Sequence, residues 1–189
     1  MDFQKIHNKG QAQIFRNGYL EYLTKTHPLV IWGMYLPVLI FLPYYSITQL
    51  YISGFTVFLV FAGGIFFWSF MEYVLHRFAF HYHPETEKGK RINYVLHGNH
   101  HEYPRDKERL CMPAAPSLII ASLFFITFFL IMGKFAFPFC PGFMLGSLVY
   151  GSMHYAIHDW NMPFKCVNGL WRNQPLPPYK PTVWGFVFY

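Results

Sequence analysis

Residues 55–70 read FTVFLVFAGGIFFWSF, a stretch without a single charged side chain. Three similar runs lie at 29–45, 115–132 and 139–157, and each approaches the ~20 residues that a helix needs to cross a ~30 Å hydrocarbon layer. A soluble domain of 189 residues offers a small core for 22 phenylalanines, so four buried helices of a soluble all-α protein are the weaker alternative. The sequence predicts an all-α membrane protein with four transmembrane helices.

The 15 lysines and arginines are distributed unevenly around these runs. Four precede the first run, seven lie in 76–114, three follow the fourth run, and Lys134 alone occupies a loop on the opposite side. By the positive-inside rule, both termini and the central loop are expected in the cytoplasm. The net charge of +6 suits an anionic inner leaflet, and six acidic residues between 72 and 108 interrupt the basic ones. We therefore expect a membrane partner and no nucleic acid.

The chain is expected to form one domain, 1–189, in which 1–28 is a polar cytoplasmic arm. No cleavable signal peptide is visible, and 11–26 is a candidate for a short surface helix. Pro138 and Pro141 are expected to bracket the outer turn before the fourth run. The three cysteines form no C-x-x-C pair, so neither a disulfide framework nor a structural zinc site is predicted.

Seven of the ten histidines fall into three clusters with the patterns H-x4-H, H-x2-H-H and H-x3-H. They are His76, His81, His97, His100, His101, His154 and His158. Residues three and four apart share one face of a helix, and the second and fourth runs should end on the same side of the membrane. The three clusters are therefore expected to meet at one boundary. A lone histidine is usually structural, but seven at these spacings favour a metal site, with zinc, copper, iron and nickel all open.

Three sequence stretches then suggest a family. HRFAFH at 76–81, HGNHHEYPRDKERLCMPAAPS at 97–117 and YGSMHYAIH at 150–158 resemble the fatty acid hydroxylase superfamily, with the greatest likeness to fatty acid 2-hydroxylases that act on sphingolipid acyl chains. The likeness runs from about Asn8 to Lys180. It implies a cytoplasmic-side di-iron centre among four transmembrane helices, with zinc as an alternative occupant in a purified protein. It also implies dioxygen as co-substrate and a lipid acyl chain as substrate.

The resemblance makes the seven histidines the metal ligands, and no further catalytic residue is predicted. Glu72, one helical turn before His76, is a candidate to orient that ligand, the alternative being a solvated interfacial glutamate. Tyr155 and Asp159 are weaker candidates for the same kind of role. No haem or flavin motif is present, so electrons are expected from an external donor protein.

The stretch RNQPLPPYK at 172–180 departs from the family pattern. The family has a further H-x2-H-H cluster here, and the three ligand positions are occupied by Gln174, Pro177 and Pro178. Proline has no donor atom for a metal and disrupts a helical turn. The chain is therefore expected to be a di-iron lipid hydroxylase with doubtful activity. The alternatives are an inactive membrane pseudoenzyme, or a sterol or carotenoid hydroxylase or desaturase of the same superfamily.

Overall fold

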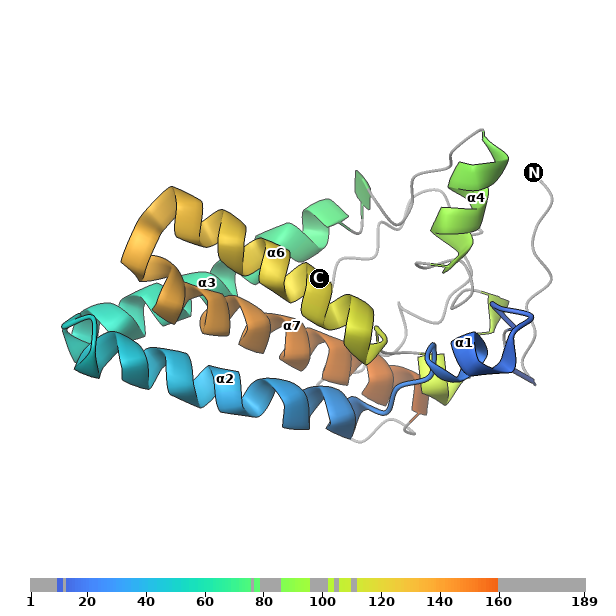
Figure 1. The fold of residues 1–189 in the computed structure, drawn as a ribbon, viewed down its shortest axis with the longest axis horizontal. Helices are drawn as coiled ribbons and strands as arrows, with labels where there is room; N and C mark the ends of the chain where they lie inside the picture. Colours follow the sequence, from blue (N-terminus) through green and yellow to red (C-terminus); the bar gives the residue numbers. More distant parts are fainter. Residues whose placement is uncertain are drawn as a thin grey trace.

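The computed structural model describes residues 10–11, 13–75, 77–78, 86–95, 102–103, 106–109 and 112–159. Every regular element in these ranges is helical, as Figure 1 shows. The elements are α1 (Gly18–Tyr22), α2 (Pro28–Thr48), α3 (Gly54–Leu75), α4 (Glu87–Asn93), η3 (Lys107–Arg109), α6 (Ala114–Met132), η4 (Gly133–Phe135) and α7 (Ala136–Asp159). The prediction of an all-α protein is confirmed for this part of the chain.

Three helical stretches are long and apolar enough to cross a membrane: Pro28–Thr48, Gly54–Leu75 and Ala114–Ala156. The third contains α6, η4 and most of α7, with a short 3-10 turn between the two helices. Length and composition are those of an integral membrane protein. The number of crossings and the cytoplasmic location of both termini stay predictions.

The four long helices pack as a bundle in which α7 contacts α2, α3 and α6 (Figure 1). Its core is aromatic: Phe128, Ala136, Cys140 and Phe143 are buried, and Phe67, Trp68 and Phe124 pack against them. Ring centroids of Phe128 and Phe139 lie 4.9 Å apart in a T-shaped arrangement. Most other large apolar side chains of the bundle point outward, which is expected where lipid replaces water as the surrounding solvent.

Glycines bring the backbones of α3 and α7 into direct contact. A Cβ placed on Gly64 would lie 2.3 Å from the carbonyl oxygen of Phe139, and one on Gly142 would lie 2.0 Å from that of Phe61. A Cβ on Gly146 would lie 2.7 Å from Cβ of Trp68. Small residues at helix interfaces allow such close approach within a membrane. The α3–α7 pair is therefore the most tightly packed in the bundle.

Two expectations need correction. Pro138 and Pro141 lie inside α7 and are fully buried, whereas the turn before this helix is formed by Gly133–Phe135. Pro138 is the third residue of α7 and loses no internal hydrogen bond, because the first four N–H groups of a helix have no partner there. Pro141 is the sixth residue and lies inside the helix, where its missing N–H removes one internal hydrogen bond. Gly133 instead makes the turn, with a φ of 56° that favours glycine. In the arm, the helix spans only Gly18–Tyr22 and does not extend over 11–26.

Candidate functional site

The C-terminal ends of α3 and α7 lie side by side and run in the same direction. Trp68 packs against Gly146, and one turn further the Tyr150 hydroxyl donates a hydrogen bond to the carboxylate of Glu72. Both helices advance by four residues between these two contacts, so they stay in step through this turn. The prediction that the second and fourth spans end on the same side is confirmed for the bundle.

The contact continues from Tyr150 to the first histidine of the third cluster. The rings of Tyr150 and His154 stack, with centroids 6.2 Å apart and planes inclined by 18°. Glu72, Tyr150 and His154 are all half-buried and form a chain of three polar side chains across two helices. Sequence reasoning missed Tyr150, although its position one turn before His154 was a usable signal.

The start of α2 closes the same end of the bundle. Trp32 Nε1 donates to Ser152 Oγ at 2.9 Å, and the rings of His27 and Tyr155 meet edge to face at 6.4 Å. The Nδ1 atom of His27 also accepts the N–H of the first turn of α2 at 3.2 Å, so this histidine serves as a helix cap. The Tyr155 ring thus contacts the residue that caps α2, and its role as an orienting residue stays a prediction.

The first turn of α6 reaches this end as well. The hydroxyls of Tyr35 and Ser117 are 2.7 Å apart, which joins α2 to α6. The carboxyl ends of α3 and α7 and the amino ends of α2 and α6 therefore meet at one end of the bundle. Figure 1 shows α1 and α4 beyond this end. The polar segments of the chain gather here, at the end where the sequence predicts a metal site.

The structure describes only part of the predicted ligand set. His154 is described in full, whereas for His158 and Asp159 only the backbone, within α7, is described. The other predicted ligands and the three departed positions lie outside the described residues: His76, His81, His97, His100, His101, Gln174, Pro177 and Pro178. Among the described residues, no three His, Cys, Asp or Glu side chains form a metal-binding group. The ligand set stays a prediction.

Comparison with known proteins supplies the family. The profile of the fatty acid hydroxylase family matches residues 61–176. The ceramide very long chain fatty acid hydroxylase of Saccharomyces cerevisiae is 35% identical over 164 residues, covering 83% of this chain and 41% of that protein. A dihydroceramide fatty acyl 2-hydroxylase of Arabidopsis thaliana is 32% identical over 156 residues, covering 82% and 65%.

A solved structure agrees with these relatives. Full-length scs7p, of which only the hydroxylase domain is visible, superposes with a TM-score of 0.79 at 30% identity, covering 88% of this chain and 63% of that one. The chain spans less than two thirds of the length of these three proteins. The family profile nevertheless covers more than half of the chain, and it includes most of α3, all of α7 and all three histidine clusters. The chain belongs to the fatty acid hydroxylase family.

Proposed function

We propose that this chain is a membrane oxygenase of the fatty acid 2-hydroxylase type, which hydroxylates a long acyl chain of a lipid. The relatives' names specify ceramide and dihydroceramide acyl groups, and the apolar helices suit a substrate that resides in a bilayer. The observation that carries the proposal is the matched packing of α3 and α7, which ends in the contacts between Glu72, Tyr150 and His154.

The helix register supports a shared site for the first and third clusters. Trp68–Gly146 and Glu72–Tyr150 are successive contacts of two parallel helices that advance in steps of four. The same step of four leads from Glu72 to His76 and from Tyr150 to His154 in the sequence, and from this register we infer that His76 pairs with His154. His158 lies one further turn along α7, on the same face as His154. We infer that these histidines bind a common metal centre.

The donor set fits two iron ions, with zinc as an alternative occupant in a purified protein. Neutral imidazoles suit both metals, and the half-buried His154 imidazole is stacked on the Tyr150 ring, which supports a fixed ring orientation for a ligand. When bound, two iron ions would activate dioxygen for insertion of one oxygen atom into an acyl C–H bond. Electrons would come from an external donor protein.

The residues of this chain would prepare that chemistry. The Tyr150 hydroxyl holds the carboxylate of Glu72, and its ring restricts rotation of the His154 imidazole. Glu72, one turn before His76, is placed in the helix sequence to accept a hydrogen bond from that ligand.

A second candidate function is that of an inactive membrane pseudoenzyme. It is favoured by the sequence at Gln174, Pro177 and Pro178, where the family resemblance implies histidine ligands. A metal with fewer ligands binds more weakly, and two-electron activation of dioxygen needs both metals. A sterol or carotenoid hydroxylase or desaturase of the same superfamily is the third candidate.

Iron content and turnover of the purified full chain separate these candidates. The chain is reconstituted with iron and a competent electron donor. The 2-hydroxy acyl product is measured with a ceramide substrate, and oxidised ring products are measured with sterol and carotenoid substrates. Two irons per chain with acyl product support the hydroxylase. One iron or none, without product, supports the pseudoenzyme, and restoring histidine at Gln174, Pro177 and Pro178, with Pro175 also replaced, should then raise the iron content. Oxidation of the ring substrates alone would refute the leading proposal.

A further inference from the structure

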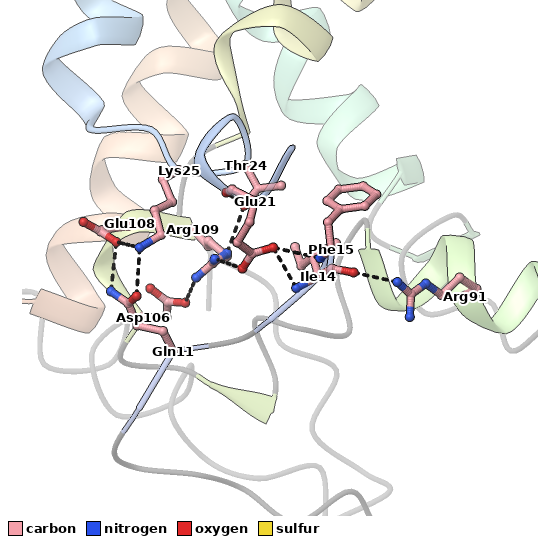
Figure 2. A network of polar contacts seen from close by, with 10 residues as sticks. All are labelled: Gln11, Ile14, Phe15, Glu21, Thr24, Lys25, Arg91, Asp106, Glu108 and Arg109. Atoms are coloured by element: carbon pink, nitrogen blue, oxygen red, sulfur yellow. Dashed lines mark hydrogen bonds and ion pairs between the residues drawn. The ribbon is translucent and has the colours of Figure 1, made fainter. Parts of the chain in front are cut away.

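A buried ion-pair network joins the N-terminal arm to η3 (Figure 2). Arg109 is its centre, with only 4% of its side chain exposed. Its Nη1 donates to Asp106 Oδ2 at 2.6 Å, its Nη2 pairs with Glu21 Oε1, and its Nε donates to Thr24 Oγ1 at 3.2 Å. Glu21 and Thr24 precede Arg109 by more than 80 residues. The guanidinium therefore fixes two distant segments to each other.

Glu21 also organises the arm itself. Its second carboxylate oxygen accepts the backbone N–H groups of Ile14 and Phe15, at 3.1 and 2.8 Å. The same carboxylate thus folds the segment before α1 and binds the arginine of η3. Glu21 is 17% exposed at its side chain and Asp106 is 3% exposed, so both carboxylates are largely removed from water, and both pair with Arg109. Removing one member of such a buried set leaves an uncompensated charge, which is strongly unfavourable.

A second layer of contacts surrounds this centre. Lys25 pairs with Glu108 at 2.6 Å, and the amide of Gln11 bridges the two, with both of its hydrogen bonds at 2.8 Å. The backbone N–H of Thr26 donates to the carbonyl oxygen of Glu108 at 2.8 Å. Because α2 begins at Pro28, these contacts place η3 directly beside the entry to the first span.

The arm also reaches the segment that precedes the second histidine cluster. Arg91, in α4, donates to the carbonyl oxygen of Ile14 at 2.6 Å. The hydroxyl of Tyr94 is hydrogen-bonded to the carboxylate of Glu102, which joins the two sides of the intervening segment. His97, His100 and His101 lie between these residues in sequence. Contacts of the arm therefore hold both flanks of the second cluster, Arg91 before it and 106–109 after it.

We propose that Glu21 and Arg109 are positioning residues, which hold both flanks of the second histidine cluster on the N-terminal arm and so set the place of this cluster at the helix ends. The relevance to a metal rests on the proposed function, whereas the attachment of the flanks does not. A buried, forked guanidinium with two carboxylates gives the attachment of the arm to η3 one geometry, because each partner must occupy a defined direction.

Hydrogen exchange of the full chain in lipid nanodiscs tests the attachment. Glu21→Gln keeps the shape of the side chain and removes its charge, and Arg109→Lys keeps the charge and removes the fork. In both variants, amide protection across 86–109 should fall by roughly tenfold, the equivalent of one lost charge-assisted hydrogen bond. Protection of α3 and α7 should not change. The matched control is Glu87→Gln, which removes an exposed pair with Lys90 on α4 and should leave protection within about twofold.

Cobalt(II) titration of the same variants tests the link to the metal. Weaker cobalt binding by roughly tenfold in Glu21→Gln, with α3 and α7 still protected, supports the positioning role. Unchanged protection across 86–109 would overturn the proposal, as would an equal loss in every helix, which indicates general destabilisation. If the unmodified chain binds no cobalt, the proposed function fails, while hydrogen exchange still decides whether the flanks are held.

Discussion

Replacing Gly64 by alanine should separate α3 from α7. The added Cβ would lie 2.3 Å from the carbonyl oxygen of Phe139 and 2.7 Å from the backbone nitrogen of Phe143. Both are backbone atoms of a helix, so neither can rotate away. The shorter distance must increase by about 1.1 Å to reach the 3.4 Å at which van der Waals contact becomes ordinary. The two helices must move apart by a comparable amount.

The expected cost follows from this displacement. Overpacking of a well-packed core costs about 1–3 kcal/mol, and rigid backbone neighbours favour the upper end. A gap of ~0.5–1 Å also forfeits a quarter to a half of the dispersion energy at each remaining contact. Alanine in a helix recovers about 1 kcal/mol relative to glycine. We expect Gly64→Ala to lower the free energy of unfolding by about 2 kcal/mol.

The neighbouring residue supplies the control. A Cβ on Gly63 would meet nothing within 4 Å, so Gly63→Ala in the same helix should be neutral or stabilising by up to about 1 kcal/mol. Unfolding by titration with sodium dodecyl sulfate, followed by circular dichroism, gives both values. A difference of about 2–3 kcal/mol between the two variants is expected. Equal unfolding of the two variants would show that α3 and α7 do not meet as described, and the inferred pairing of His76 with His154 would fail with it.

Three further predictions concern the polar end of the bundle and its opposite end. Tyr150→Phe removes the hydrogen bond to Glu72 and keeps the ring, so metal affinity should fall by roughly 10-fold with helix content unchanged, as measured by cobalt(II) titration. Burial and a neighbouring carboxylate raise the pKa of Tyr94 to about 12, whereas an unfolded tyrosine ionises near 10. Its contribution to stability is therefore complete below pH ~10 and is lost up to pH ~12. The difference in tyrosinate absorbance between the unmodified chain and a Tyr94→Phe variant should appear near pH ~12, and a difference that appears at pH ~10 would contradict this. Cysteine variants of Ser53 and Gly133, in a background without the native cysteines, should react with an impermeant thiol reagent from the outer face only; reaction from the cytoplasm would reverse the topology.

The apolar helices could be predicted from the sequence because each run carries its own signal. The expected runs 29–45 and 115–132 differ from α2 and α6 by at most a few residues at each end. The ends of the helices are harder to predict, because they depend on the backbone conformation of single residues. Pro138 and Pro141 indicate a turn in the sequence, but Pro138 lies in the first turn of α7, which tolerates proline, and Pro141 lies inside the helix. The actual turn depends on the positive φ of Gly133.

The ion-pair network could not be predicted in the same way. Glu21 and Arg109 are 88 residues apart, and no local periodicity connects them. The sequence places Arg109 in the stretch 97–117 that resembles the family, and Glu21 enters only the net charge, so neither signal connects the two residues. The contact between Glu72 and Tyr150 is equally non-local, but the step of four to His154 made Tyr150 detectable. Sequence patterns identify residues that share a helix face, whereas pairings between segments require the packed structure.

The buried charges of Glu21, Asp106 and Arg109 are relevant to whether this chain binds a metal. Well-packed apolar residues often stabilise a protein as much as a buried ion-pair set does, so stability alone does not require Glu21, Asp106 and Arg109. What the charged set adds is one specific docking of the arm on η3, beside the second histidine cluster. By contrast, the residues at Gln174, Pro177 and Pro178 offer at most one weak amide ligand. If the first three clusters meet as proposed, seven histidines are still positioned to bind metal. The total number of ligands is then smaller than the family resemblance implies. We therefore expect one firmly held metal and one weakly held metal rather than an empty site.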